Sequence, residues 1–498
     1  MTPNAWMPIL VVLSSMLPGL MIFLLSETQK PLRILLNLLG VFATLFLVVS
    51  MLAGVYGGEA YETRLPFLPH LDLVLRAGPL ALLFATLSSF LWFLTTVYAI
   101  GYLEGSAHSS RFFGFFSLCV TATIGVALSG NLLTFILFYE LLTLATYPLI
   151  VHRGTEEARL AGQSYLVYTL FGGAMLLFAT VWLYHLTGTL EFTPRGFVAD
   201  HAGGTGPAAL TGIFTLLIAG FGVKAALVPL HGWLPRAMVA PAPVSALLHA
   251  VAVVKAGAFG IIRVVYEVFG IERSAMLGLT SPLAAVASLT IIYGSIRALF
   301  QDDLKRRLAF STVSQVSYIV LGVAIVGPVA TIGGVVHLVH QGVMKITLFF
   351  CAGNLAETLG IHNISDMNGV GRRMPWTMAA FSVAALGMIG VPPMAGFVSK
   401  WYLGLGGLEA GAGWVIPVLV VSTLLNAAYF LPILYRAWFL PAPKQWPHEQ
   451  TFGRQETKWT LLIPPLATAA LALGIGLFAA SEYSPLGWVH LIAEREFY

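Results

Sequence analysis

Long apolar runs recur along the whole of this chain, and no other feature constrains its fold as strongly. A run of about 18 or more residues with few charges is long enough to cross the hydrocarbon core of a bilayer as a helix. Fourteen such segments can be drawn, near 5–25, 32–56, 78–103, 112–129, 131–151, 160–186, 208–236, 242–269, 278–300, 308–327, 329–355, 376–405, 412–435 and 458–481.

These runs predict helices rather than the strands of a membrane barrel. Barrel strands are about ten residues long with strict alternation, whereas these segments are longer and continuously apolar. A helix also satisfies its own backbone hydrogen bonds in lipid. We therefore expect an all-α polytopic membrane protein of about fourteen transmembrane helices, forming a single membrane domain over residues 1–498.

Composition excludes several other classes of protein. Only 10% of the residues are charged, whereas a soluble domain carries about 25%. The net charge of +4 comes from Lys and Arg spread singly between apolar runs, which argues against a nucleic-acid partner. Cys119 and Cys351 lie in apolar stretches without a CxxC or Cys/His cluster. We therefore expect no metal, no cofactor and no catalytic centre of the chain's own. The N-terminus lacks the basic region of a signal peptide, so we expect a retained first helix.

The distribution of positive residues predicts the orientation of the helices. Sixteen Lys and Arg follow odd-numbered segments, whereas six, Arg263 among them, lie near the outer ends of even-numbered segments or in the C-terminal tail. Loops rich in Lys and Arg stay in the cytoplasm. The count predicts a multi-pass protein of a bacterial or archaeal cytoplasmic (inner) membrane, with both termini on the outer, periplasmic side.

Five ionisable residues remain inside apolar sequence: Glu140, Lys224, Lys255, Lys345 and Lys400. Each costs about 2.5–3.5 kcal/mol at the centre of a bilayer, so such a residue indicates function by default. Any one of them could instead reach the interface or form a static pair. Five together make that alternative a poor one. Glu140 lies about nine residues into its segment and needs a cationic partner or a hydrated cavity.

Two of the lysines adjoin predicted breaks in their helices. Lys224 precedes Pro229 in GFGVKAALVPLHGWLP, and Lys400 follows ALGMIGVPPMAGFVS. Proline removes a backbone donor, and broken helices occur in membranes where protein or water covers the backbone. Two such segments, each with one lysine, indicate internal repeats with central binding sites. The predicted breaks are at Pro229, Gly390, Pro392 and Pro393.

A third polar feature is the segment GGVVHLVHQGVMKITLFF. Its His337, His340, Gln341 and Lys345 share one side of a helix. Because imidazole both accepts and donates protons near neutral pH, this side predicts a proton relay, to which His249 can contribute. The alternative is that the histidines are only hydrogen-bonded to neighbouring helices.

These residues also carry a resemblance to a known family. At Glu140, Lys224 with VPLHGWLP, Lys255, DLKRRLAFSTVSQVSYIVLG, the histidine segment and GVPPMAGFVSK, the sequence resembles antiporter-like proton-translocating subunits. Such subunits are shared by respiratory complex I (NADH:quinone oxidoreductase), Mrp-type cation/proton antiporters and membrane-bound hydrogenases. The resemblance covers roughly residues 75–440 and implies two inverted five-helix repeats, 112–269 and 278–436, each with a discontinuous helix beside a central hydrated axis.

The resemblance also implies roles for the buried residues. Glu140 and Lys224 would form a gating pair, Lys255 a central relay and Lys400 the terminal site, with connectors at His337, His340 and Lys345. Two departures bear on the branch. Some members have Glu where this chain has Lys400, and a short tail replaces the long lateral helix of the largest members. We therefore expect a chain nearer the Mrp D-type or hydrogenase-type branch.

The leading hypothesis is a proton-translocating subunit of a multisubunit complex, coupled to redox chemistry or cation exchange in its partners. The expected partners are other membrane subunits, a soluble or peripheral module, protons and lipid. One alternative is a Na⁺/H⁺ antiporter subunit, although a single mid-membrane carboxylate, Glu140, favours protons. Another is an anchoring or energising subunit for a hydrogenase, formate dehydrogenase or inorganic-carbon-uptake protein.

Overall fold

The computed structural model of the chain describes residues 3–201, 204 and 206–497. Its first half contains α1 (Pro3–Phe23), α2 (Lys30–Tyr56), β1 (Tyr61–Leu68), β2 (Leu71–Ala77), α3 (Pro79–Tyr102), α4 (Ser109–Leu128), α5 (Leu132–Ile150), α6 (Glu156–Thr187), α7 (Val198–His201), α8 (Pro207–Lys224), α9 (Trp233–Arg236), the 3-10 turn η1 (Ala237–Val239), α10 (Ala242–Ala246), the π-helical turn η2 (Leu247–Val251), α11 (Val253–Arg263) and the π-helical turn η3 (Val264–Val268).

In the second half, every regular element of the described chain is a helix or a helical turn. It contains α12 (Ile271–Met276), α13 (Thr280–Leu299), α14 (Leu304–Ala324), α15 (Pro328–Leu359), the 3-10 turn η4 (Ile364–Asp366), α16 (Val370–Arg373), α17 (Pro375–Ile389), α18 (Ala395–Glu409), α19 (Val415–Phe439), α20 (Trp459–Leu477) and α21 (Pro485–Phe497). Several helices begin at a side chain that accepts a backbone N–H, as at Asn131 before α5, Thr155 before α6 and Asp303 before α14.

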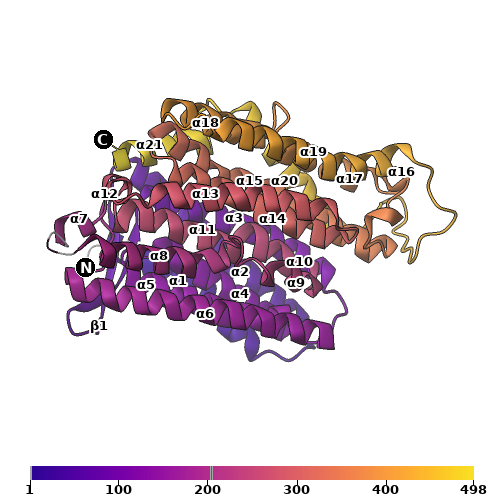
Figure 1. The fold of residues 1–498 in the computed structure, drawn as a ribbon. Helices are drawn as coiled ribbons and strands as arrows, with labels where there is room; N and C mark the ends of the chain where they lie inside the picture. Colours follow the sequence, from indigo (N-terminus) through magenta and orange to yellow (C-terminus); the bar gives the residue numbers. More distant parts are fainter. Residues whose placement is uncertain (1–2, 202–203, 205, 498) are drawn as a thin grey trace.

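The helices lie side by side in one bundle (Figure 1). In the described part of the chain, 13 helical spans are long and apolar enough to cross a bilayer, with Ala242–Val268 taken as one span. The shorter apolar helix α17 and the helix α18 both pack against α15 and α20 on either side of a break, and together they make a further crossing. The prediction of an all-α membrane protein with about fourteen helices is confirmed.

Both chain ends lie at the same end of the bundle, together with β1, α7, α12 and α21, while α9, α10 and α16 lie at the opposite end (Figure 1). This is the arrangement that an even number of crossings requires. Strands β1 and β2 form an antiparallel hairpin in which Tyr61 lies opposite Ala77. This hairpin was not predicted from the sequence.

The most buried spans are those that carry most of the ionisable residues. Ala242–Val268, α14 and α15 are enclosed by other helices along their apolar windows, whereas most of the corresponding positions of α2 and α6 face outward. A charge that faces lipid costs far more free energy than one that faces protein or water. We therefore expect spans with ionisable residues to lie inside the bundle, as these do.

Each predicted repeat contains one helix break. The range 112–269 includes the break after α8, and the range 278–436 includes the break between α17 and α18. The inverted symmetry between the two ranges stays a prediction.

Candidate functional site

The first helix break begins where it was predicted. Helix α8 ends at Lys224, and α9 begins only at Trp233, so Pro229 lies in non-helical chain. The Trp233 indole donates to the Val223 carbonyl at 2.8 Å and so satisfies one of the backbone groups that the break leaves free. Lys224 is 1% exposed. Its ammonium donates to the Tyr139 carbonyl and lies 3.5 Å from the centroid of the Tyr139 ring.

Glu140 follows Tyr139 on α5, so Lys224 contacts the residue next to the carboxylate. One Glu140 oxygen, Oε1, is buried and has no hydrogen-bond partner within the described chain. No direct ion pair within 4.0 Å joins Glu140 to Lys224 among the residues described. The Glu140 carboxylate and the Lys224 ammonium are neighbours without forming an ion pair. A movement of either side chain can therefore form one. The gating role of this pair stays a prediction.

Gly173 on α6 makes room for the Glu140 carboxylate. A Cβ atom added there would lie 2.5 Å from Oε1 and 2.8 Å from the carboxyl carbon. Gly173→Ala therefore displaces the carboxylate without removing its charge. We expect proton transport by the reconstituted complex to fall several-fold, with assembly unchanged. Gly474→Ala on α20, where an added Cβ meets nothing within 4 Å, is the matched control. Equal transport by the two variants would show that the position of Glu140 is unimportant.

Lys255 lies on α11 and is 0% exposed. Its ammonium has no hydrogen-bond partner in the protein, as far as the structure describes it. Helix α11 packs against α8 of the first half and α14 of the second, which puts Lys255 between the two halves. Gly257 permits this close approach, because a Cβ there would lie 2.2 Å from the Ala225 backbone nitrogen in the first break.

His249 occupies the turn η2 before α11. It is 0% exposed, and its ring centroid lies 4.5 Å from that of Phe349 on α15. Neither ring nitrogen has a protein partner in the described residues. His249 therefore lies in the same interior as Lys255 and beside the helix of the predicted relay.

The predicted relay residues lie on α15, and all are buried. His337 is hydrogen-bonded to Ser399 at 2.8 Å and to Gln315 at 3.1 Å, as the structural alternative expects. His340 differs, since neither of its nitrogens has a partner within the described chain. Lys345 donates to the Ser311 hydroxyl at 2.9 Å.

The second break separates α17 from α18 and contains Gly390, Pro392 and Pro393, as predicted. Gly390 adopts a positive φ of 95°, a conformation that favours glycine. The Lys400 ammonium donates to the Ile389 carbonyl at 2.6 Å and to the Thr423 hydroxyl at 3.0 Å. Lys400 thus caps the carbonyl end of the broken helix, where a positive charge is favourable.

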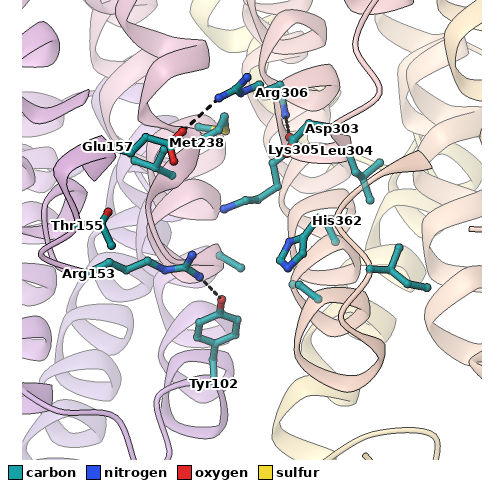
Figure 2. Close-up of a pocket in the computed structure, with 16 residues that line it drawn as sticks. Tyr102, Arg153, Thr155, Glu157, Met238, Asp303, Leu304, Lys305, Arg306 and His362 are labelled. Carbon is teal, nitrogen blue, oxygen red and sulfur yellow. Dashed lines mark hydrogen bonds and ion pairs between the residues drawn. The ribbon is translucent and has the colours of Figure 1, made fainter. Parts of the chain in front are cut away.

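A cavity of about 280 Å³ opens at the end of the bundle opposite the termini. Its walls include the chain after α5, the turn η1, the start of α14 and the end of α15 with the chain after it. The connections at this end of the bundle follow odd-numbered predicted segments. Figure 2 shows Arg153 and Lys305 reaching into it from opposite walls, with His362 beside them. Lys305 also donates to the Ala240 carbonyl at 2.7 Å, immediately before α10.

Comparison with known proteins identifies the family. Residues 129–426, more than half of the chain, match the family described as NADH:quinone oxidoreductase/Mrp antiporter, TM. The chain belongs to this family. It is 36% identical over 424 residues to NADH-quinone oxidoreductase subunit N of Desulforudis audaxviator, covering 82% of this chain and 83% of the relative. It is 30% identical over 432 residues to Hydrogenase-4 component B of Escherichia coli, covering 82% of this chain and 63% of the relative.

The fold has a solved counterpart. A chain of the Mrp complex from Dietzia sp. DQ12-45-1b superposes with a TM-score of 0.86 over 100% of this chain and 98% of its own length, at 22% identity. The predictions of an antiporter-like membrane subunit of the NADH:quinone oxidoreductase/Mrp family, and of its membrane-helical fold, are confirmed. The finer predictions of branch, orientation and residue roles stay predictions.

Sequence reasoning missed one group of buried charges. Arg263, counted above among residues near an outer end, is only 6% exposed and forms an ion pair with Glu267, which is 2% exposed. Their i, i+4 spacing in an apolar segment was the available signal. Glu496 on α21 is 3% exposed, and its polar surroundings in the sequence gave no sign of burial.

Proposed function

We propose that the chain translocates protons along Glu140, Lys224, Lys255, His249, His337, His340, Lys345 and Lys400. The observation that carries the proposal is Lys255, which is fully buried between the two halves of the bundle without a protein partner in the described structure. A buried ammonium group without hydrogen bonds is costly. Water that reaches the Lys255 ammonium would supply the missing hydrogen bonds. A proton path requires such a hydrated interior lined by titratable groups.

The interaction between Glu140 and Lys224 has the right size to drive a proton step. Two unit charges about 4 Å apart interact by about 4 kcal/mol at an effective dielectric constant of 20. Moving one proton against 100 mV costs about 2.3 kcal/mol. Formation or loss of this one pair therefore supplies enough free energy to load or expel a proton.

The cavity with Arg153 and Lys305 provides the entrance from the cytoplasm in this proposal. Its lining includes Ala352 of α15, seven residues beyond Lys345 and so about 10 Å along the helix. The connections that line the cavity follow odd-numbered segments, where most of the Lys and Arg lie, and this proposal places them in the cytoplasm. Both termini, at the opposite end of the bundle, then lie on the outer side of a bacterial or archaeal cytoplasmic membrane.

We further propose that the chain works inside a multisubunit membrane complex with a soluble or peripheral module that supplies the driving reaction. The names of its relatives, a NADH-quinone oxidoreductase subunit and a hydrogenase component, support this proposal. Proton transport is then coupled to redox chemistry or cation exchange in the partners, and the chain acts as a translocase subunit.

Flux measurements on the intact complex in proteoliposomes test the function. We expect the driving reaction to acidify one side of the membrane in the absence of Na⁺. A strict requirement for Na⁺, accompanied by movement of radioactive Na⁺, would instead identify a Na⁺/H⁺ antiporter subunit. Assembly with a soluble partner but no ion movement of either kind would identify an anchoring subunit.

A further inference from the structure

A continuous chain of hydrogen bonds leads from Lys345 to the second helix break. The Lys345 ammonium donates to the Ser311 hydroxyl at 2.9 Å. The Tyr429 hydroxyl lies 2.9 Å from Ser311 Oγ and 2.7 Å from Asn426 Oδ1. Asn426 donates through Nδ2 to the Met388 carbonyl at 3.3 Å. We call Ser311, Tyr429 and Asn426 the Tyr429 chain. All three side chains are 0% exposed, and none belongs to the proton path described above.

The packing of four helices brings the Tyr429 chain together. Ser311 lies on α14, which packs against α15, the helix that carries Lys345. Asn426 and Tyr429 are three residues apart on α19 and therefore share one side of that helix. Helix α19 packs against α17, which ends at the second break. The chain thus joins the relay helix to the break through protein side chains alone.

The Tyr429 chain ends on a carbonyl that the second break leaves free. Helix α17 ends at Ile389, so the carbonyls of its last turn have no partner within the helix. The Met388 carbonyl accepts from Asn426, and the next carbonyl, that of Ile389, accepts from Lys400 at 2.6 Å. The Tyr429 chain and Lys400 therefore hold neighbouring peptide groups of the same helix end.

Two other polar groups adjoin the Tyr429 chain. Arg307 donates to the backbone carbonyl of Tyr429 at 3.0 Å and so does not use its hydroxyl. The Ser295 hydroxyl lies 3.5 Å from Asn426 Oδ1, which is the limit of a hydrogen bond. The short contact from Tyr429 therefore decides how firmly the Asn426 side chain is held.

The number of hydrogen atoms makes the Tyr429 chain switchable. A tyrosine hydroxyl has one hydrogen, so Tyr429 donates either to Ser311 or to Asn426. A charged lysine only donates, so Ser311 then accepts from Lys345 and is free to donate to the Tyr429 oxygen. Tyr429 in turn donates to Asn426. A neutral Lys345 amine instead accepts from Ser311, which accepts from Tyr429, and Asn426 loses its short hydrogen bond.

We propose that Tyr429 is a positioning residue that couples the charge of Lys345 to the second helix break. This proposal rests on the proposed function. A proton that binds Lys345 turns the hydroxyl hydrogens so that Asn426 holds the break and Lys400 keeps its contact with Ile389. When Lys345 loses the proton, Asn426 is released and the break loosens. Only the N–H bond of Lys345 forms or breaks, since the hydroxyl hydrogens merely rotate.

Infrared spectroscopy of the intact complex with isotope-labelled tyrosine tests this coupling. The C–O stretch of a tyrosine responds to the hydrogen bonds of its hydroxyl, and Tyr429→Phe identifies the band of Tyr429. Lys345→Met removes the ammonium donor and leaves Ser311 open to accept from Tyr429. We therefore expect Lys345→Met to shift the Tyr429 band. Tyr435→Phe, on the same helix at a 57% exposed position, is the matched control and leaves the band intact. A Tyr429 band that Lys345→Met does not move overturns the proposal.

Ser311→Ala separates a hydrogen-bonded coupling from a simple electric field. If the coupling passes through the Ser311 hydroxyl, Lys345→Met no longer shifts the Tyr429 band once Ser311 is replaced by alanine. A shift of equal size with and without this hydroxyl would mean that Lys345 acts on Tyr429 through space, and it would overturn the proposed chain.

Transport by the same samples separates this proposal from the proposed function. We expect Tyr429→Phe to lower proton flux several-fold at unchanged assembly, and Tyr435→Phe to leave it unchanged. Ser311→Ala should cause a similar loss, and the double variant with Tyr429→Phe no greater one, because both changes break the same chain. Wild-type flux in Tyr429→Phe, or losses that multiply in the double variant, overturn the coupling role. A wild-type complex that moves no protons, although its Tyr429 band responds to Lys345→Met, contradicts the proposed function and leaves the coupling supported.

Discussion

Replacement of Lys224 by alanine is expected to lower coupled proton transport by about tenfold or more, since loss of about 1.4 kcal/mol in a limiting step already gives a tenfold decrease. The Lys224 ammonium contacts the Tyr139 carbonyl and lies beside Glu140. Without it, the partly buried Glu140 carboxylate loses the cation with which it is expected to form a pair. Glu140→Ala removes the other half and should have an effect of the same size. The measurement is proton uptake by proteoliposomes that contain the whole complex.

Controls distinguish a transport defect from a folding defect. Lys444→Ala changes an exposed lysine and should leave transport unaffected. The amount of assembled complex should stay near the wild-type level for all variants. Transport that survives both Lys224→Ala and Glu140→Ala would exclude the gating pair. Glu140→Gln separates charge from shape, and wild-type flux in that variant would mean that Glu140 is structural.

The physics of the bilayer explains why much of this structure is predictable from the sequence. Lipid permits only helices or closed barrels and makes every exposed charge costly. The apolar runs therefore locate the crossings, and the charges stranded within them identify side chains that face the interior. Lys255 and Lys345 are fully buried, and the proline-bearing breaks adjoin Lys224 and Lys400.

Contacts between distant segments were not predictable in the same way. Nothing in the sequence indicates that Lys224 donates to Tyr139, or that Gly173 and Gly257 permit close packing around Glu140 and the first break. These features depend on how helices far apart in the chain come together.

Arg263 and Glu496 show a second limit of sequence reasoning. A count of Lys and Arg by position treats each one as facing water, although Arg263 pairs with a carboxylate inside the protein. Glu496 lies in a polar stretch whose burial depends on the docking of α21 against α3 and α15. The count of Lys and Arg uses only the order of residues along the chain, whereas the burial of a side chain depends on how the helices pack.

Substitution of Lys400 tests most directly how the second half of the chain takes part in proton transport. Its ammonium donates to the Ile389 carbonyl and to Thr423. Glutamate can make the same contact with a carbonyl only when it is protonated, so the site itself favours loading of a proton. We expect Lys400→Glu to retain part of the transport activity and Lys400→Met to lose it, with little change in assembled complex, measured in the same proteoliposomes.

Lys400→Arg separates a proton store from a fixed charge. Arginine keeps the positive charge and the donors but does not release its proton in a protein. If Lys400 stores a transferable proton, the arginine variant should be as inactive as the methionine variant while the glutamate variant works. Activity in Lys400→Arg or Lys400→Met together with a dead Lys400→Glu would mean that Lys400 contributes only packing or a fixed positive potential. The proton path would then have to leave the chain by another route, and the interior around Lys255 is the candidate.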